Sequence, residues 1–215
     1  MSGCQGIRMT VGSKDTCMDK AIEIVPALKR VELQHVGCWE ELCMEFLPGL
    51  NIITDDYRGT GKSTILRAIV KAVRPSIRME YSVSPTRGYP EGHIFVELMS
   101  PNITHRITDS LSLPLARASN EPQGNFSLKL LRYYIEGATP STAIIVEDEV
   151  TAVLDDHTYA EAVILLNASL CQVVCIISHR LNPNQFRQAR IYACYWDKED
   201  DKARIRLQQS GLADC

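Results

Sequence analysis

The sequence predicts an α/β protein: a mostly parallel sheet flanked by helices, joined to an antiparallel β portion. Two observations support this prediction. In the second half of the chain, short apolar runs that resemble buried strands alternate with helical segments, which is typical of a parallel sheet. In the first third, short strand-like runs follow one another closely, as paired antiparallel strands do. With 215 residues, the chain is long enough for one large domain of this class.

The first half is expected to contain most of the antiparallel strands. Residues 1–25 have a mixed composition, and we expect a loose arm ahead of one domain over 26–215. Residues 28–33 alternate between apolar and polar side chains, as a half-buried strand does. In order, the predicted elements are strands at 28–33, 42–46 and 50–54, a helix at 62–74, strands at 79–83, 93–99 and 103–108, and a loop at 109–124.

The second half is expected to alternate between helices and strands. Leu128, Leu131 and Ile135 recur at helical spacing, and Gly137 ends that helix. The predicted elements are a helix at 126–136, a strand at 142–146, a helix at 158–170, a strand at 172–177, a short helix at 183–190, and strands at 191–196 and 203–207. An acidic turn at 197–201 joins the last two strands.

Charge and composition restrict the function. A net charge of −3 gives no global positive field to attract nucleic acid, so DNA binding would need a local patch. Six Lys and Arg residues within 62–90 are one candidate, although a phosphate-binding lysine plus a solvated helix face explains them more simply. No apolar run approaches the ~20 residues of a membrane helix, and residues 1–10 lack a signal-peptide core. We therefore expect a soluble, cytoplasmic protein whose eight cysteines are reduced.

The most informative stretch is residues 51–64, Asn-Ile-Ile-Thr-Asp-Asp-Tyr-Arg-Gly-Thr-Gly-Lys-Ser-Thr. An apolar strand leads into a loop of small residues, and the loop leads into a helix. This is the layout of a phosphate-binding loop, in which backbone amides and the helix N-terminus surround an anion. Lys62 would reach the terminal phosphates, and the Ser63 hydroxyl would ligate Mg²⁺. Asp56 stands where the usual motif has its first glycine.

Two further strands carry polar residues at their ends. Residues 143–149, Ala-Ile-Ile-Val-Glu-Asp-Glu, form an apolar run that ends in carboxylates, at the end of a strand where open α/β sheets bind ligands. Asp148 would support magnesium, and Glu149 would polarise an attacking water. The alternative is an acidic turn that caps the next helix. A second apolar strand, over 172–177, is followed by Ser178 and His179.

Together these motifs resemble those of the ATP-binding-cassette (ABC) ATPases. Residues 148–155, Asp-Glu-Val-Thr-Ala-Val-Leu-Asp, are similar to the D-E-P-T-A-A-L-D run that joins the Walker B carboxylates to the D-loop in that family. Ser178 and His179 resemble its switch histidine. Residues 28–33 and 48–54 resemble the soluble branch that contains the SMC and RecF heads. The resemblance covers roughly residues 28–196 and implies a P-loop NTPase fold of the ABC-ATPase head type.

The resemblance also implies roles for individual residues. It implies that the phosphates of ATP and the Mg²⁺ ion are held by Gly59, Thr60, Gly61, Lys62, Ser63 and Thr64. It further implies metal support by Asp148, water activation by Glu149 and γ-phosphate sensing by His179. Asp155 would communicate across a dimer, because two heads of this family enclose two nucleotides between them.

Each head of the family supplies a signature loop to the nucleotide of its partner. The candidate here is residues 121–125, Glu-Pro-Gln-Gly-Asn, just ahead of the predicted helix, and Gly124 is its matching glycine. Pro122 replaces the signature serine, and Glu147 places a charge where the Walker B strand expects an apolar residue. The spacing from Lys62 to Asp148 is too short for a long coiled coil or for the helical subdomain of a transporter.

The resulting prediction is a compact, Mg²⁺-dependent ATPase that dimerises on ATP and drives or gates a partner. By resemblance to trimmed SMC-like heads, that partner would be an effector such as a nuclease, in DNA repair or anti-phage defence. The second subunit would be another copy of the chain or a related head. Two alternatives remain open, a regulatory nucleotide sensor that barely hydrolyses ATP and a nucleotide-binding subunit of a transporter.

Overall fold

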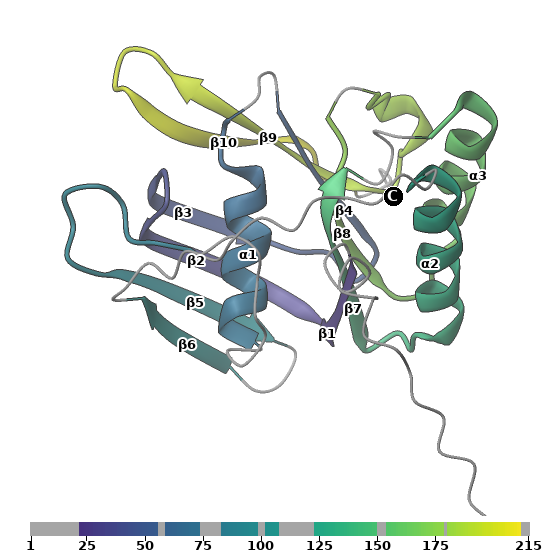
Figure 1. The fold of residues 1–215 in the computed structure, drawn as a ribbon, viewed down its shortest axis with the longest axis horizontal. Coiled ribbons are helices and arrows are strands. Elements are labelled where there is room, and N and C mark those ends of the chain that lie inside the picture. The colour runs from purple at the N-terminus through teal and green to yellow at the C-terminus, as the bar shows by residue number, and fades with distance from the viewer. Residues whose placement is uncertain are drawn as a thin grey trace, which may run out of the picture.

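The computed structural model describes residues 22–55, 59–73, 83–98, 102–107, 123–149, 154–178 and 180–211. These residues form two sheets with a helix between them and two helices on the far side of the larger sheet (Figure 1). The central helix is α1 (Lys62–Val73). The outer helices are α2 (Gln123–Gly137) and α3 (Asp156–Asn167), and a short 3-10 helix, η1, spans Pro183–Gln185.

The larger sheet has six strands in the order β1-β7-β8-β4-β9-β10. The four inner strands β7, β8, β4 and β9 run parallel, while β1 and β10 lie antiparallel at the two edges. All five residues of β8 are buried, as expected of a parallel strand covered on both faces. The strands are β1 (Ile22–Pro26), β4 (Leu50–Asp55), β7 (Thr142–Glu149), β8 (Gln172–Ile176), β9 (Arg190–Asp197) and β10 (Lys202–Gln209).

The smaller sheet is entirely antiparallel, in the order β3-β2-β5-β6. Buried and more exposed residues alternate along β3 and β5, because one face packs on the core while the other faces solvent. The strands are β2 (Leu28–Val36), β3 (Trp39–Glu45), β5 (Gly92–Leu98) and β6 (Asn102–Ile107). The two sheets and their flanking helices confirm the predicted fold class.

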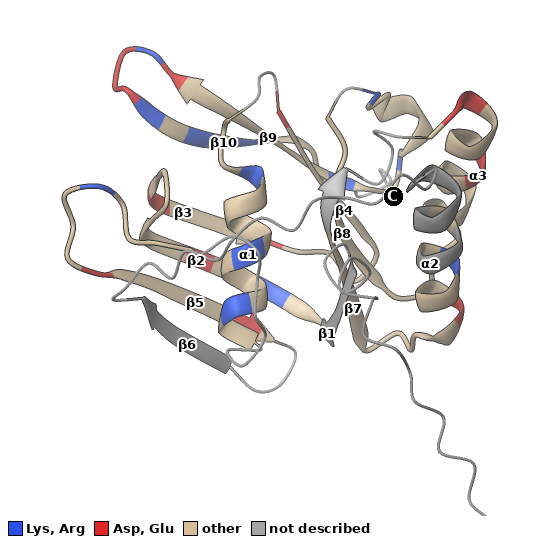
Figure 2. Ribbon diagram, viewed as in Figure 1, with Lys and Arg blue, Asp and Glu red and all other residues tan. Residues whose placement is uncertain are grey.

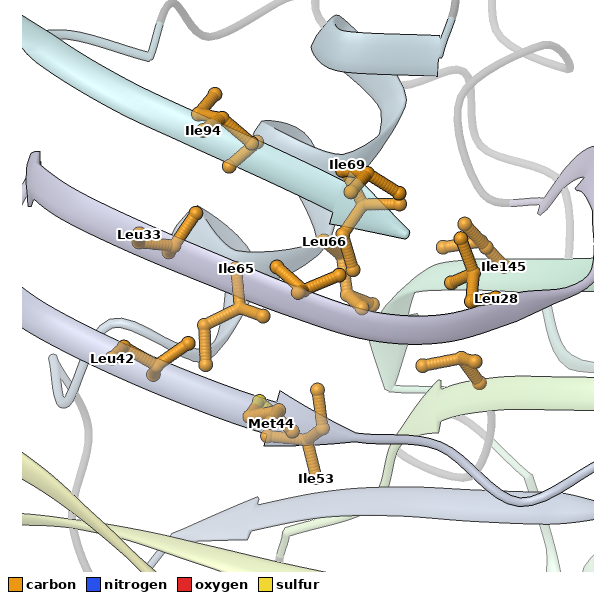
Figure 3. Close-up of a cluster of buried hydrophobic side chains, with 14 of the residues drawn as sticks. Leu28, Leu33, Leu42, Met44, Ile53, Ile65, Leu66, Ile69, Ile94 and Ile145 are labelled. Atoms are coloured by element: carbon orange, nitrogen blue, oxygen red, sulfur yellow. The ribbon is translucent and has the colours of Figure 1, made fainter. Parts of the chain in front are cut away.

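Helix α1 is the centre of the main hydrophobic core. Its residues Ile65, Leu66 and Ile69 are fully buried, and they pack between the antiparallel sheet and the larger sheet (Figure 3). Burying each such side chain stabilises the fold by about 1.5–3 kcal/mol. A second core on the opposite face of the larger sheet takes Leu131 from α2 and Leu166 from α3. The position of α1, and therefore of its N-terminus, is thus determined by both sheets.

One buried polar side chain joins the two sheets. Gln172, at the start of β8, accepts a hydrogen bond from the Leu28 amide at 2.6 Å. Its Nε2 group donates to the carbonyl oxygens of Leu28 at 2.8 Å and Leu47 at 2.7 Å. All three partners are backbone groups, so Gln172 holds the start of β2 against the parallel sheet.

The structure differs from the sequence predictions at a few boundaries. Residues 22–25 are not part of a loose arm, because they pair with β7 as strand β1, in the register Ile22 to Val146. The helix predicted at 126–136 begins earlier, at Gln123. The strand predicted at 79–83 falls almost entirely outside the described residues, as does most of the loop at 109–124. Within the described ranges, no helix has the length and hydropathy needed to span a bilayer.

Candidate functional site

Three neighbouring parallel strands, β4, β8 and β7, end together at the carboxyl-terminal edge of the larger sheet. Strand β8 lies between β4 and β7, and the register aligns Ile53, Ile176 and Glu149 across the three strands. At the usual strand spacing, β4 and β7 are therefore about 10 Å apart. The β7–β8 register shifts between Val146 and Glu149, so the strand end that carries the carboxylates is irregular.

The described residues do not include every predicted site residue. The backbone of Asp148 and Glu149 belongs to β7, but their side chains fall outside the description. His179 lies outside the described residues, although Ile177 and Ser178 before it are described. The same holds for Asp56 in the loop. The roles of Asp148, Glu149 and His179 therefore remain predictions.

We call residues 59–64, which the sequence predicts to bind phosphate, the phosphate-binding loop. They include the first turn of α1, which begins at Lys62, and the Ile65 amide closes this turn on the Gly61 carbonyl at 3.3 Å. The first amides of a helix have no partner within the helix and point toward its N-terminal side, where they attract anions. The predicted strand–loop–helix layout is therefore present, with Lys62 and Ser63 in the first turn of the helix.

The tip of the β2–β3 hairpin packs against this loop. The indole of Trp39, which is fully buried, donates a hydrogen bond to the Gly61 carbonyl at 3.1 Å. Gly61 has φ +86°, and a Cβ atom there would lie 2.3 Å from the Cys38 sulfur. A Cβ atom on Gly37 would likewise lie 2.7 Å from a methyl carbon of Thr64. Only glycine fits at either position, so hairpin and loop are built against each other.

Asp55, the last residue of β4, is the ion-pair partner of the lysine in this loop. Lys62 Nζ forms an ion pair with Asp55 Oδ2, and Thr60 Oγ1 donates to the same oxygen at 3.1 Å. The Asp55 side chain is 4% exposed and that of Lys62 is 13% exposed. The loop therefore already directs two donors at one anionic oxygen. Sequence reasoning missed Asp55, although an acid directly ahead of a phosphate loop was a usable signal.

This donor set fits a phosphate group and its metal. Lys62, Thr60 and the helix amides are all donors suited to an anion, and a carboxylate oxygen of Asp55 shows where one is held. The Ser63 hydroxyl, in the first turn of α1, is the oxygen ligand that Mg²⁺ prefers. At the end of β8, the hydroxyl oxygen of Ser178 is buried without a hydrogen-bond partner in the described structure.

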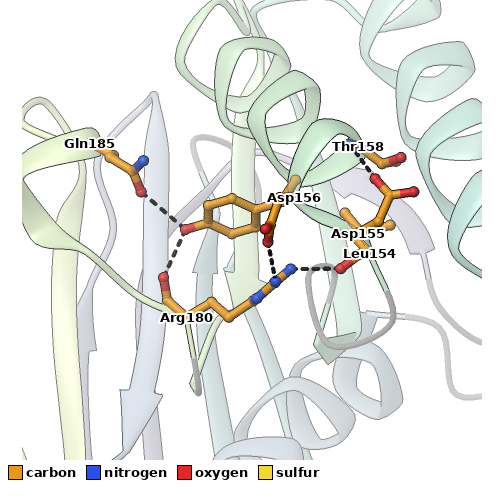
Figure 4. Close-up of polar contacts among 7 residues, drawn as sticks. Leu154, Asp155, Asp156, Thr158, Arg180 and Gln185 are labelled. Atoms are coloured by element: carbon orange, nitrogen blue, oxygen red, sulfur yellow. Dashed lines mark hydrogen bonds and ion pairs between the residues drawn. The ribbon is translucent and has the colours of Figure 1, made fainter.

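A second cluster lies where the segment after β8 contacts the N-terminal end of α3. We call residues 154–156 the D-loop segment and residues 177–181 the switch segment. Asp155 caps α3 by accepting the Thr158 amide at 2.8 Å, and this backbone hydrogen bond lowers the pKa of its carboxyl below the usual value. Arg180 joins the two segments through hydrogen bonds to Leu154 and Asp156 (Figure 4). Sequence reasoning did not single out Arg180.

Gly124 was predicted to lie in a loop ahead of the helix, but it lies inside the first turn of α2. The apolar residues from Leu128 onward predicted the body of this helix but not the polar turn before them. Glu121 and Pro122, the first residues of the predicted signature loop, lie outside the described residues. The backbone amide of Gly124 still belongs to the first turn, where helix amides lack partners within the helix.

The cysteines of the described part of the chain are free thiols. Burial raises the pKa of both the Cys175 and the Cys194 thiol to about 12. Cys194 is also close enough to Lys62 for that positive charge to oppose the shift. Burial raises the pKa of Cys38 as well. These thiols are protonated at neutral pH, so they behave as small apolar side chains.

Sequence comparison finds no matching protein-family model and no matching curated protein. Comparison of the fold does find similar solved structures. The SMC head domain from Thermotoga maritima has a TM-score of 0.50 at 12% identity, over 85% of this chain and 99% of that chain. An SMC head bound to the C-winged helix domain of ScpA also has a TM-score of 0.50, at 11% identity and the same coverage. The chain therefore has the fold of an SMC head domain.

Proposed function

We propose that this protein is a Mg²⁺-dependent ATPase that binds ATP, dimerises on it and thereby drives or gates a partner protein. The observation that carries the proposal is the alignment of three strand ends at one edge of the larger sheet. Strand β4 leads into the phosphate-binding loop, β7 ends at Glu149, and β8 leads toward His179. This is the edge at which open α/β sheets bind ligands.

Each residue of this site has a separate role in binding or hydrolysing ATP. Lys62 exchanges the carboxylate of Asp55 for the terminal phosphates, while the helix amides hold the phosphate oxygens. Glu149, at the end of β7, orients and deprotonates the attacking water, and His179 contacts the γ-phosphate. Ser63 and Asp148 would hold Mg²⁺, which neutralises charge on the β- and γ-phosphates when bound.

A second subunit completes the site. The phosphate-binding loop surrounds one side of the triphosphate, and the first turn of α2 at Gly124 presents backbone amides to the nucleotide of another copy or of a related head. One similar structure is an SMC head bound to a domain of another protein, which supports an effector that is gated by the head. A nuclease in DNA repair or anti-phage defence is the effector that we expect.

DNA contact is a separate prediction. The basic residues within 62–90 include Lys62, Arg67 and Lys71 on α1, and Figure 2 shows blue segments along that helix. All three are partly buried, and Lys62 is paired with Asp55. A phosphate-binding lysine plus a partly solvated helix face therefore remains the simpler interpretation.

The second candidate function is a nucleotide sensor that hydrolyses ATP very slowly. The observation that favours it is the altered signature sequence at residues 121–125, in which Pro122 replaces the serine and only Gly124 matches. Turnover separates the two functions. A sensor binds Mg-ATP and dimerises without measurable phosphate release, whereas an ATPase releases phosphate at a rate that depends on Glu149.

The experiment compares wild type, Glu149→Gln and the surface control Glu199→Gln. Calorimetry measures ATP binding, phosphate release measures turnover, and sedimentation measures the oligomeric state with and without Mg-ATP. We expect Glu149→Gln to bind ATP normally, to lose turnover and to form the more stable ATP-dependent dimer, because the triphosphate persists. Wild-type turnover in Glu149→Gln would assign the base elsewhere, with Glu147 as the first alternative. A monomer at saturating ATP would contradict homodimerisation.

A further inference from the structure

Arg180 connects the two segments that flank the ends of β7 and β8. It follows His179 directly in the sequence, and its side chain reaches the residues on either side of Asp155 (Figure 4). We infer that Arg180 is a positioning residue that couples the switch segment to the D-loop segment, so that occupancy of the γ-phosphate position is transmitted to the dimer-facing Asp155. This inference rests on the proposed function.

The guanidinium of Arg180 holds the D-loop segment with two of its nitrogens. Nη1 donates to the Leu154 carbonyl at 2.6 Å, and Nη2 donates to Asp156 Oδ1 at 2.6 Å. These two partners are the immediate neighbours of Asp155. A guanidinium is planar and its donors have a fixed geometry. The side chain of Arg180 therefore fixes the orientation of the backbone around Asp155, in addition to attracting the Asp156 carboxylate.

Tyr159 of α3 contacts both the backbone and the side chain of Arg180. Its hydroxyl donates to the Arg180 carbonyl at 2.8 Å, and its ring lies 5.2 Å below the guanidinium carbon. The hydroxyl oxygen is also 3.1 Å from Gln185 Oε1. Arg180 is therefore attached to α3 through its backbone and its side chain at once. The Tyr159 hydroxyl therefore holds the peptide group between Arg180 and Leu181 against α3.

The directed hydrogen bonds contribute more to this coupling than the charge does. The Asp156 side chain is 96% exposed, and an ion pair that is so open to water contributes little. The Leu154 carbonyl and the Tyr159 hydroxyl are partly buried in their bonds to Arg180. A lysine at position 180 would keep the positive charge but would lose the planar pair of donors. Lysine should therefore not replace arginine here.

The backbone hydrogen bonds between β7 and β8 do not connect these two segments. In the described residues, the pairing of β7 with β8 ends at Glu149 and Ile176, before either segment begins. Beyond that point, Arg180 and Tyr159 join the segment after β8 to the segment before α3. A shift of His179 toward a phosphate therefore pulls on Leu154 and Asp156 through Arg180.

The test uses Arg180→Ala, Arg180→Lys and Tyr159→Phe in the full chain, with Arg187→Ala as control. Arg187 is exposed, and its backbone carbonyl, rather than its side chain, accepts the bond from Gln209. Calorimetry with Mg-ATP, steady-state phosphate release, and amide hydrogen exchange of residues 154–160 with and without Mg-ATP are measured for each. Thermal unfolding identifies any variant that fails to fold.

We expect Arg180→Ala to bind Mg-ATP within about threefold of wild type, because the phosphate-binding loop is intact, while kcat falls at least tenfold. Protection of residues 154–160 that wild type gains on adding Mg-ATP should be lost. Arg180→Lys should behave like Arg180→Ala, Arg187→Ala like wild type, and Tyr159→Phe should lie between them. If Arg180→Ala unfolds, Tyr159→Phe, which loses one hydroxyl, decides the question.

Wild-type kcat together with wild-type ATP-induced protection in Arg180→Ala would overturn the inference while leaving the proposed function intact. Full rescue by Arg180→Lys would overturn it too, since charge alone would then suffice. Failure of wild type itself to bind Mg-ATP would instead remove the proposed function, and the inference with it. If wild type binds without turnover, the hydrogen-exchange comparison alone decides.

Discussion

Replacing Asp55 by Asn tests whether the phosphate-binding loop contains its own competitor for the nucleotide. The Asp55 carboxylate is 4% exposed and pairs with Lys62, which is 13% exposed. Asparagine keeps the shape of the side chain and a hydrogen-bond acceptor for Thr60 but removes the negative charge. We expect two linked effects, a less stable nucleotide-free protein and tighter binding of Mg-ATP.

The size of both effects follows from burial of the pair. Removing one partner of a buried ion pair costs about 3–5 kcal/mol, and the residual exposure of Lys62 reduces this to about 2 kcal/mol here. For a chain of this size, such a loss lowers the midpoint of thermal unfolding by about 4–8 °C. ATP supplies the missing counter-charge, so the same free energy is recovered on binding. Affinity should rise about tenfold to thirtyfold, since tenfold corresponds to about 1.4 kcal/mol.

The assay is calorimetric titration with Mg-ATP together with thermal unfolding with and without the nucleotide. Asp200→Asn is the matched control, because it breaks an exposed ion pair with Arg204 on the β9–β10 hairpin and should change neither quantity. In Asp55→Asn, saturating Mg-ATP should bring the unfolding midpoint back toward that of wild type. Weaker or unchanged ATP binding in Asp55→Asn would refute the competitor role and would make Asp55 a support for the loop.

Three further predictions concern the framework of the site. Gly61→Ala should destabilise the protein and abolish ATP binding, because its Cβ would lie 2.3 Å from the Cys38 sulfur. The control is Gly88→Ala, at φ +94°, where an added Cβ would have no atom within 4 Å. It should lower the free energy of unfolding only by backbone strain of about 1–2 kcal/mol, measured by thermal unfolding. Gln172→Ala should lower unfolding stability by about 3 kcal/mol, since it leaves three backbone partners without their hydrogen bonds, whereas the exposed Gln208→Ala should be neutral. The pKa of about 12 at Cys175 and Cys194 predicts that peptide-resolved alkylation at pH 8 labels exposed Cys43 before these two, which are spared until unfolding. Because the folded-state pKa values of Cys175 and Cys194 are raised, their contribution to stability is complete below about pH 9 and is lost as pH rises toward 12.

The elements with a clear local pattern were predictable from the sequence. Alternation identified β2, and a continuous apolar run identified β8, whose five residues are all buried. The edge strand β1 was missed, because residues 22–26 are held by pairing with β7 rather than by a pattern that extends over a longer run. Likewise, the start of α2 was placed too late, since its first turn is polar and precedes Leu128.

The candidate site was predictable only where neighbours in sequence are neighbours in space. The strand, loop and helix of residues 50–73 form one continuous stretch, so Lys62 and Ser63 could be recognised directly. The position of β8 between β4 and β7 depends on sheet order, which spacing along the chain does not determine. The contacts of Arg180 with Leu154 and Tyr159 span more than 20 residues and depend on rotamers, so no sequence pattern identified them.

The central claim is that residues 59–64 bind the phosphates of Mg-ATP. Calorimetric titration of wild type, Lys62→Ala and Lys71→Ala tests it most directly, because Lys71 lies on the same helix, more than two turns after Lys62. The account predicts that Lys62→Ala weakens Mg-ATP binding at least tenfold, about 1.4 kcal/mol or more, through loss of charge-assisted contacts to phosphate. Lys71→Ala should bind as wild type does. Equal Mg-ATP affinity in wild type and Lys62→Ala, or no binding by wild type, would contradict the account.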